Sequence, residues 1–536
     1  MKKVPPFTNR WLITGTLTTL SELHIGDGGE GEIHNRAARA DKEKKQSDAS
    51  TVAVDVHGRA FIPASAIKGV LRARLKACAN GGGSANIPAP PTQPWDELLG
   101  SESVDAPGAV GAKLVFFDAF HQSGHAQPTL PAPGLGSEAD IRRPWWDDTR
   151  KTCVAVAVSL DRRTRTAKEQ LLYHLEYVPA GEVFTLEIGG DNLTKDEVRA
   201  LLSLLESFNN PHLPVTLGGQ ASNSWGRVGW KCTQALCFDN LPAWLKEEDP
   251  PTGYDICKSE KFGRDILPDL IPAKTEVNTP PGTLTIELEL IMESPWLICD
   301  PRQSERSSES KGREEADKPV DARPIQDEEG RPFIPAKSLR GALRSRAEMI
   351  LRTLNLPCAD HPSVLPSVTT KGGDASSAIR EITQLDLAAR LFGLSGWLAP
   401  LHIPRFYPPP GSSPVPHHQE FVAIDRFTGG AANQAKFDAD LAGITTLTGT
   451  LTLDLTRLGK VDQGLASLAL LAFVLRDLAE GDIPIGAGSS KGQGLCSARG
   501  KVTENGTVHQ NLPDWFAHST LLNKAIETLC PQPTKR

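Results

Sequence analysis

The chain has 536 residues, of which 39% are hydrophobic and 23% charged, and its net charge is −7. This length exceeds one ordinary hydrophobic core, and the balance of apolar and charged residues excludes an intrinsically disordered chain. Because the net charge is negative, the molecule as a whole has no general affinity for nucleic acid, and any such site has to be local. The 47 Gly and 42 Pro indicate many turns, which favours a β-rich or mixed α+β fold over a helical bundle.

The segment MKKVPPFTNRWLITG at the start of the chain contains no apolar run long enough for a signal peptide or a membrane span. We therefore expect a cytoplasmic protein with no membrane partner. The nine Cys residues form no CxxC pair, which predicts reduced thiols and no disulfide framework. Zinc has little support, since Cys358 with His361, and His121 with His125, offer only two ligands each.

Both halves of the chain begin with the pattern of a half-buried strand. Apolar and polar residues alternate in RWLITGTLTTLSELHIG, which starts at Arg10. The alternation is clearer in TLTIELELIMESPWLI, which starts at Thr283 and places Leu284, Ile286 and Leu288 on one face. A long charged segment rich in turn residues follows each strand, and such a segment is typical of a surface loop.

The next segment of each half is nearly the same phrase. GRAFIPASAIKGVLRAR starts at Gly58 and GRPFIPAKSLRGALRSR at Gly330, an offset of 330 − 58 = 272. Ile-Pro ends a strand, because proline lacks the N–H that a central strand donates. We expect a helix to follow, with Ser65 or Ser338 as its N-cap and an apolar stripe packed on a sheet.

Each repeated phrase is also a basic island in an acidic protein. Five basic residues and no acid lie from Arg59 to Lys76, and again from Arg331 to Arg346. A glycine in the first helical turns costs ~1 kcal/mol relative to alanine, and close approach of an RNA backbone would explain it. The alternative is a solvated basic face on a packed helix. The predicted RNA-binding residues are Ser65, Lys68, Gly69, Arg72, Ser338, Arg340, Gly341 and Arg344.

Further segments recur in the same order in both halves, which indicates a tandem duplication. WDELLG is answered by AARLFG, VSLDRRTRTA by VAIDRFTGGA, and GGQASNSWGRVG by GAGSSKGQG. The last pair are Gly-rich loops without the GK[ST] of a P-loop, so nucleotide hydrolysis is not expected. Their N–H groups can wrap an RNA backbone, and the alternative is a plain tight turn. We assign RNA binding there to Gly226, Arg227, Lys491 and Gly492, with an offset of 492 − 226 = 266.

The duplication and the composition define the predicted domains. The first covers residues 1–241 and the second residues 283–505. The Pro-rich, polar segment 242–282 is predicted to be a linker, and 506–536 a C-terminal appendage whose amphipathic helix packs on a core.

These motifs together resemble the RAMP superfamily of CRISPR proteins. The resemblance rests on LHIG, FIPASAIKG and FIPAKSLRG, LFG, an Asp-Arg-x-Thr turn and the Gly-rich loops, over about residues 7–240 and 283–500. It implies an α+β fold of two tandem ferredoxin-like (RRM-like) domains with long loop insertions. The motifs are most similar to backbone subunits of type III effector complexes, in the fused form of type III-D variants. The two-domain tip subunit of type III-B complexes is the alternative.

The resemblance also implies a site. The family's cleavage aspartate lies in the loop before the Ile-Pro motif, which assigns Asp321 in the second half and Asp48 in the first, with Asp327 and Asp55 at a later position. Asp48 is one residue out of spacing, and Asp41 and Asp27 are further candidates. A carboxylate beside an RNA phosphate can position hydrated Mg²⁺, or another divalent cation, or accept the proton of the attacking 2′-OH. Asp321 and Asp48 are therefore also the expected metal ligands.

The predicted function is a metal-dependent endoribonuclease subunit that binds guide RNA (crRNA) and cuts the paired target RNA. Its expected partners are these two RNAs and the other type III subunits, including the large polymerase-like one. A scaffold that only organises the guide is one alternative. A guide-processing endoribonuclease that uses His24 of LHIG as acid or base is the other.

Overall fold

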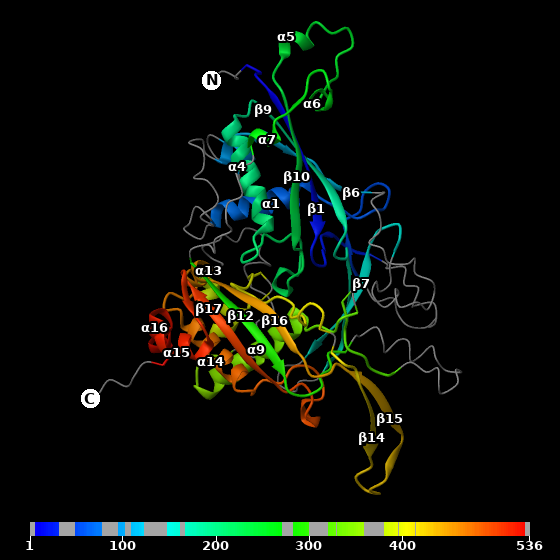
Figure 1. Cartoon of the computed structure of the whole chain (residues 1–536), viewed down its shortest axis with the longest axis vertical. Coiled ribbons are helices and arrows are strands. Elements are labelled where there is room, and N and C mark those ends of the chain that lie inside the picture. Colours follow the sequence, from blue (N-terminus) through cyan, green and yellow to red (C-terminus); the bar gives the residue numbers. More distant parts are fainter. Residues whose placement is uncertain are drawn as a thin grey trace, which may run out of the picture.

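The structure is a computed structural model of the chain, and Figure 1 shows its two halves stacked along the long axis of the molecule. None of the helices in the described ranges is both long and apolar enough to cross a membrane. The structure describes residues 6–31, 49–77, 95–101, 109–122, 147–160, 167–270, 282–299, 320–327, 330–358, 380–394, 396–412 and 414–530.

The first half is built around β1 (Arg10–Thr19), the strand that the alternating pattern predicts. Its buried residues share one core with those of α1 (Ala64–Ala77) and α4 (Lys195–Leu205), the two helices on one face of the sheet. The sheet runs in the order β11 (Arg264–Asp265), β10 (Val228–Phe238), β1, β9 (Val183–Asp191), β6 (Ala119–His121) and β4 (Phe61–Ile62), with β5 (Leu114–Phe116) also paired to β9.

In the second half, β12 (Thr283–Met292) takes the central place. Its inward leucines pack with α9 (Ala336–Thr353) and α14 (Ala466–Ala479) in a second core. The predicted apolar stripe of the repeated helix is confirmed, since Leu339, Leu343 and Ala347 are fully buried. The sheet runs in the order β13 (Leu401–His402), β16 (Thr446–Asp454), β12, β17 (Cys496–Glu504) and β18 (Thr507–His509).

Each half therefore has the ferredoxin-like arrangement. The chain order is strand, helix, strand, strand, helix, strand: β1, α1, β6, β9, α4, β10 in the first half and β12, α9, β13, β16, α14, β17 in the second. In both sheets the four strands lie in the order fourth, first, third, second, and neighbours are antiparallel. The predicted α+β fold of two tandem ferredoxin-like domains is confirmed.

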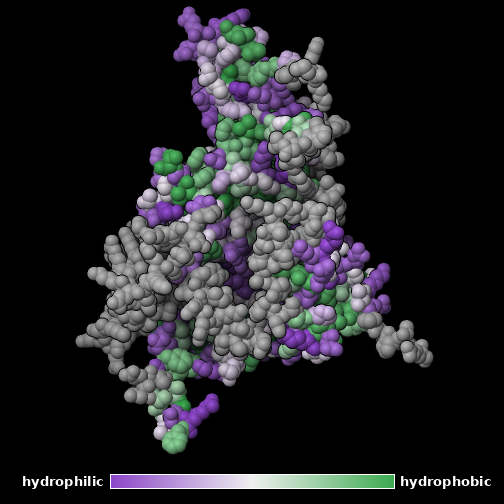
Figure 2. Space-filling model, turned by 180° about the vertical axis from the view of Figure 1, so that it is seen from behind, coloured by the Kyte–Doolittle hydropathy of each residue, from purple (hydrophilic) through white to green (hydrophobic). Residues whose placement is uncertain are grey.

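In each domain a long hairpin is inserted between the second and the third strand of the ferredoxin-like sheet. In the first half, β7 (Cys153–Leu160) and β8 (Ala167–Tyr177) join β2 (Gly26–Gly31) and β3 (Ala49–Val52) in one sheet. In the second, β14 (His417–Ile424) and β15 (Ala431–Leu441) form a two-stranded hairpin that projects from the body in Figure 1. Seen from behind in Figure 2, its projecting end carries hydrophobic as well as hydrophilic residues.

The segment predicted as a linker belongs largely to the first domain. Asp265 of β11 pairs with Leu236 of β10, so this segment extends the first sheet. Ile256 and Phe262 are buried in a small cluster with Leu12. The short elements here are α5 (Leu241–Trp244), α6 (Asp255–Lys258) and α7 (Leu267–Leu270). The boundary after residue 241 is therefore corrected, because the chain continues to pack on the first sheet as far as Leu270.

The predicted C-terminal appendage is part of the second core. β18 extends the sheet, and Trp515 is fully buried with its indole Nε1 donating to Glu504 Oε2 over 2.9 Å. The expected amphipathic helix is two helices, α15 (Leu512–His518) and α16 (Thr520–Leu529). The remaining short helices are α2 (Trp95–Leu99), α12 (Leu387–Phe392) and α13 (Leu455–Gly459), with 3₁₀ turns at Glu206–Asn209, Ala221–Asn223 and Ser489–Lys491.

The two domains meet where the Gly-rich loop of the first lies on the strand after α12 of the second. We call this contact the seam. Ser224 Oγ donates to the carbonyl oxygen of Ile403 over 2.6 Å, and Arg405 forms an ion pair with Glu22. The Arg405 guanidinium also lies over the ring of Phe333 at 5.1 Å. A polar and aromatic contact therefore joins the end of one module to the Ile-Pro segment of the next.

Candidate functional site

The repeated helix of the second half buries one of its predicted RNA-binding residues. Arg340 is 8% exposed, and its guanidinium donates to the carbonyl oxygens of Phe392 (3.1 Å) and Leu401 (3.2 Å). Burial, together with the nearby charge of Arg344, lowers the pKa of Arg340 to about 10. A buried guanidinium that donates to buried main-chain carbonyl oxygens satisfies their hydrogen-bonding capacity and so stabilises the fold. It does not present its charge to a phosphate at the surface.

The neighbouring arginines bind the next repeated motif in the same way. Arg344 Nη1 donates to the carbonyl oxygen of Gly393 over 2.7 Å, and Arg72 Nη2 donates to that of Gly100 over 2.7 Å. These carbonyls end AARLFG and WDELLG, which explains why the two motifs recur together. These contacts favour the alternative of a packed helix for Arg72, Arg340 and Arg344, and RNA binding by the three arginines stays a prediction.

The two helical glycines lie on open surface. Gly69 and Gly341 are exposed, and apart from adjacent residues and the nearby backbone of the same helix, no heavy atom of the described residues comes within 4 Å of a Cβ built on either. Their lack of a side chain therefore serves no packing within the described part of the chain. Lys68 lies one residue before Gly69, and burial, then the charge of Arg72, lowers the pKa of its ammonium group. RNA binding at Lys68, Gly69 and Gly341 stays a prediction.

The N-cap prediction for the repeated helices is wrong. α9 begins after Pro335 without a side-chain cap, which places Ser338 inside its first turn. In α1, Ser65 is an exposed helical residue, and the N–H of Ala64 is instead bound by Asp118 Oδ1 at 2.8 Å. The exposed Ser65 hydroxyl stays a predicted RNA contact. Ser338 is half-buried, and its predicted contact is likewise untested.

The two Gly-rich loops share one backbone conformation. φ is positive at residues 218, 220, 224 and 226 and again at 486, 488, 492 and 494, so the offset is 494 − 226 = 268. A Cβ on Gly218 would lie 2.1 Å from the carbonyl oxygen of His24, and one on Gly486 2.4 Å from that of Leu297. Glycine is required at both positions because the loop folds tightly over the preceding strand. The sequence alignment, which used an offset of 266, is corrected by two residues.

This correction separates the residues that the sequence had paired. Gly226, with φ of +78° and a carbonyl 2.0 Å from a built Cβ, is a packed turn residue whose equivalent is Gly494. Gly492 instead has open space around it. Lys491 is exposed, and its ammonium lies 4.2 Å from the ring centre of Phe421 in β14, a cation–π contact. Arg227 lies at the seam, where burial lowers its pKa. RNA contacts by these loops remain predictions.

Asp321 lies on the surface at the base of the projecting hairpin. Its N–H donates to Asp438 Oδ1 over 2.9 Å, and the N–H of Asp438 donates to Asp321 Oδ2 over 3.1 Å. Asp438 belongs to β15, which runs parallel to the Asp321 segment at the next residue, where Ala322 pairs with Ala439. We call Asp321 and Asp438 the aspartate pair. Two carboxylates are thereby fixed in one place by main-chain hydrogen bonds.

An arginine and a histidine lie beside the aspartate pair, and both contact Asp440 of the hairpin. Asp440 forms an ion pair with Arg323 at 3.2 Å and a hydrogen bond with His418 Nδ1 at 3.0 Å. The hydrogen bond to Asp440, with the surrounding acidic charge, raises the pKa of His418. The pair therefore lies in a polar surface region that includes an arginine and a histidine. Nothing in the sequence signals Asp438, because it lies 117 residues from Asp321 and outside the repeated motifs.

The aspartates predicted at the later position hold a turn. Asp327 Oδ1 accepts the N–H of Arg331 at 2.8 Å, and its Oδ2 accepts Arg331 Nε at 2.8 Å. Asp55 binds Arg59 in the same way, over 2.9 and 3.0 Å. A glycine with positive φ, Gly330 or Gly58, completes each turn. The equivalence between halves, with an offset of 272, is therefore structural, and these aspartates act as turn supports.

A family model described as RAMP superfamily matches residues 16–229 and 289–497, one match for each half. The chain belongs to the RAMP superfamily. No curated protein matches it. The two matches coincide with the two ferredoxin-like domains, so each half is one RAMP module. RAMP proteins include RNA-binding CRISPR-associated subunits, and some are ribonucleases.

Several residues proposed for the first RAMP module fall outside the described residues. These are the cleavage candidate Asp48 and its neighbour Asp41. Asp27 is described and exposed, and Thr51 Oγ1 donates to it over 3.2 Å. Of the weak zinc motifs, His125 and His361 are also outside the described residues, so neither motif is described as a whole.

His24 is buried in this RAMP protein. It is 8% exposed, with Nδ1 2.7 Å from the carbonyl oxygen of Glu176 and Nε2 3.3 Å from Ser50 Oγ. These contacts use both ring nitrogens to hold the hairpin against the end of the first strand. An acid or base has to reach its substrate. The buried position therefore favours a structural role for His24.

The tip of the second hairpin presents an aromatic side chain that the sequence had not singled out. Phe427 is 98% exposed, and Val422 and Ile424 on β14 are about half exposed, at 50% and 57%. Asp425 Oδ1 accepts the N–H groups of Phe427 (3.0 Å) and Thr428 (2.7 Å), and the bonds from Thr428 and Phe427 lower the pKa of Asp425. The Asp-Arg-x-Thr motif is therefore the turn that fixes this tip.

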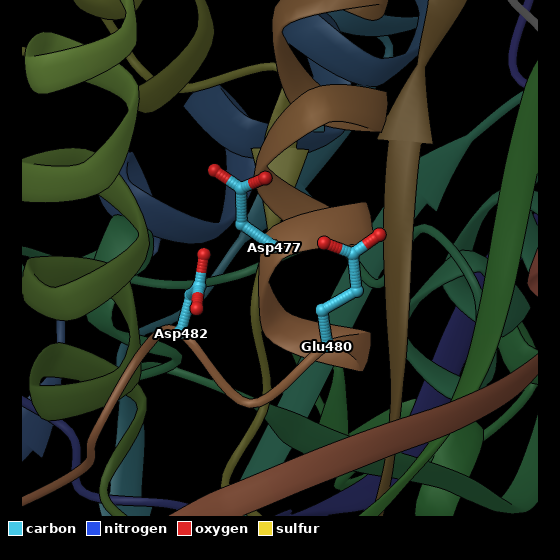
Figure 3. Close-up of side chains that lie close together, drawn as sticks. All are labelled: Asp477, Glu480 and Asp482. Carbon is cyan, nitrogen blue, oxygen red and sulfur yellow. The ribbon is translucent and has the colours of Figure 1, made fainter.

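One further group of acids lies away from the aspartate pair. Asp477, Glu480 and Asp482 at the end of α14 bring their carboxylates close together (Figure 3). Arg346 donates to Asp477 over 2.6 Å and to Asp482 over 2.8 Å, and Arg476 also binds Asp477. The positive charges of the two arginines offset the acids. We interpret the group as an ion-pair network that connects α9 to α14.

Proposed function

We propose that this RAMP protein is a backbone subunit of a type III CRISPR effector complex, in the tandem form of type III-D variants. Its two modules hold guide RNA side by side, and the second module cuts the paired target RNA at Asp321. The observation that carries the cutting role is the aspartate pair, an exposed carboxylate fixed by the main chain of a projecting hairpin. The expected partners are guide (crRNA) and target RNA and the other type III subunits, including the large polymerase-like subunit.

The proposed RNA path follows the exposed surface of the two repeated helices and the tip of the second hairpin. Lys68, Gly69 and Gly341 lie on open helix surface, where a phosphate can approach the main chain. Phe427 at the hairpin tip can stack on an unpaired base, because an exposed aromatic ring fixed by a turn loses little further entropy on stacking. These contacts do not depend on base identity, as a guide-holding surface requires.

In the proposed cutting reaction, Asp321 acts as the general base for attack by a ribose 2′-OH. The carboxylate accepts the proton of a ribose 2′-OH, and the 2′-oxygen attacks the adjacent phosphorus. The bond from phosphorus to the 2′-oxygen forms as the bond to the 5′-oxygen breaks, and the leaving 5′-oxygen takes a proton from water. The hydrogen bond from the Asp438 N–H holds the Asp321 carboxylate in one orientation. A 2′-deoxyribose at the cut position should therefore stop the reaction.

The cofactor proposed for the aspartate pair is a divalent cation, which the chemistry of its carboxylates supports. The two hydrogen bonds engage one oxygen of each carboxylate, and the second oxygens of Asp321 and Asp438 are the hard ligands that Mg²⁺ prefers. A hydrated Mg²⁺ held there would neutralise charge that develops on the phosphate. Removal of divalent cations by EDTA should therefore abolish cutting and leave guide binding intact.

The test uses complexes assembled on guide RNA with end-labelled target RNA. Asp321→Ala should lower the cutting rate by roughly 10² to 10⁴, the usual contribution of a general base, while the guide still copurifies. The control is Glu420→Ala, which removes an exposed acid from the adjoining strand β14 and should change nothing. If Asp321→Ala complexes cut at the unaltered rate, the protein is a guide-holding scaffold. The guide-processing alternative predicts immature guides with His24→Ala, and the burial of His24 disfavours it.

A further inference from the structure

The two modules differ at the place of the aspartate pair. Equivalent positions in the two modules can be found by counting back from the turn aspartates, Asp327 and Asp55. Asp321 lies 327 − 321 = 6 residues before Asp327, and the residue that lies 55 − 49 = 6 residues before Asp55 is Ala49. Both turns have the same hydrogen bonds, so the count starts from equivalent atoms. The first module therefore has alanine where the second has Asp321.

The hairpins give the same result independently. Ala322 pairs in parallel with Ala439, and Ser50 pairs in parallel with Leu175, each one residue after the position in question. In both modules the hairpin strand then bridges the end of the first strand three residues later, at Ala442 and Val178. The residue opposite Asp321 is Asp438, and the residue opposite Ala49 is His174. Both carboxylates of the pair are thus replaced in the first module.

The replacement removes both carboxylates and keeps the scaffold. Alanine has no group that accepts a proton or binds a cation. His174 carries no negative charge in either protonation state, so it does not replace the Asp438 carboxylate. Glu176, which takes the place of Asp440, is buried, accepts hydrogen bonds from the Val52 N–H and the Thr152 hydroxyl, and forms an ion pair with Arg150. The hairpin is held in position without the carboxylate site.

We propose that the first module binds RNA and does not cut it, so that each chain makes one cut for two modules. This inference rests on the proposed function and goes beyond the assignment of a cleavage aspartate to each half. Target fragments from an assembled complex should then differ in length by the span of two modules. Asp48, next to Ala49 in the sequence, should be dispensable, and so should Asp27.

The experiment compares target fragments from complexes that carry Asp321→Ala, Asp48→Ala or Asp27→Ala, with the retained guide as a check on assembly. Asp321→Ala should remove every cut made by this subunit, and the other two variants should leave every cut at the unaltered rate. The double variant Asp321→Ala with Asp438→His gives the second module the side chains of the first, and it should bind guide and target without cutting.

The outcomes distinguish failure of the inference about the first module from failure of the proposed function. If Asp321→Ala removes every second cut and Asp48→Ala or Asp27→Ala removes the others, the first module cuts. The inference is then wrong while the proposed function stands. If Asp321→Ala removes no cut, the proposed function itself fails. If Asp321→Ala removes all cuts and neither first-module variant changes any, one cut for each chain is established.

Discussion

Replacement of Arg340 by methionine distinguishes a structural arginine from a phosphate-binding one. The substitution keeps most of the volume and removes both hydrogen bonds to the Phe392 and Leu401 carbonyls, which belong to residues that are 2% and 0% exposed. Each buried carbonyl left without a donor costs about 1 to 3 kcal/mol, and loss of a buried cation returns part of this. We expect the free energy of unfolding of the second domain to fall by about 2 to 4 kcal/mol.

This loss should appear in differential scanning calorimetry of the full chain without RNA. At about 2 to 4 °C for each kcal/mol in a domain of this size, Tm of the second domain should fall by ~4 to 16 °C. The matched control is Lys68→Met at the equivalent position of the first module, where we expect a change within about 1 kcal/mol because Lys68 is only half-buried. An unchanged Tm for Arg340→Met, with weaker guide binding and a smaller salt dependence, would refute the structural role.

Other variants test the loops and the hairpin tip. Gly218→Ala forces a side chain into a position with φ of +73° and a carbonyl oxygen at 2.1 Å, so it should cost about 2 to 4 kcal/mol of stability by thermal unfolding. Gly69→Ala, on open helix surface, should raise the free energy of unfolding by about 0.5 to 1 kcal/mol, and it should weaken RNA binding if an RNA backbone approaches the helix there. Equal changes in Tm for Gly218→Ala and Gly69→Ala would contradict this account. Phe427→Ala should leave Tm unchanged and lower target affinity in the assembled complex by roughly 5- to 150-fold, measured by anisotropy, and full affinity would exclude stacking at the tip.

The sequence predicted the fold well because the fold depends on local patterns that occur twice. Alternating residues in β1 and β12, and helical spacing after Ile-Pro, specify a strand and a helix without reference to the rest of the chain. It did not predict the burial of Arg340, because periodicity identifies which face of a helix is apolar and does not say what covers the other face. In α9, the carbonyls of residues 392 and 401 cover it, more than 50 residues away along the chain.

The site was predictable only in part, for the same reason. Asp321 could be counted from a nearby motif, whereas Asp438 becomes its neighbour through a parallel pairing that no local pattern encodes. The linker was placed too early because short helices and a two-residue strand, β11, resemble a loop in composition. The Gly-rich loops were aligned two residues out of register, since equally spaced glycines do not reveal which of them has positive φ.

The seam between the two modules has an ion pair that the outer ends of the chain cannot form. Glu22 and Arg405 form an ion pair there, whereas the equivalents of these residues at the outer ends of the chain are Pro295 and Asp118, which cannot form it. A row of identical single modules would look the same after a shift by one module. A row of these chains would repeat only after two modules, because every second junction would be covalent and carry the ion pair. The fusion would therefore give such a row a repeat of two modules, and an RNA bound along it would meet two kinds of module junction in alternation.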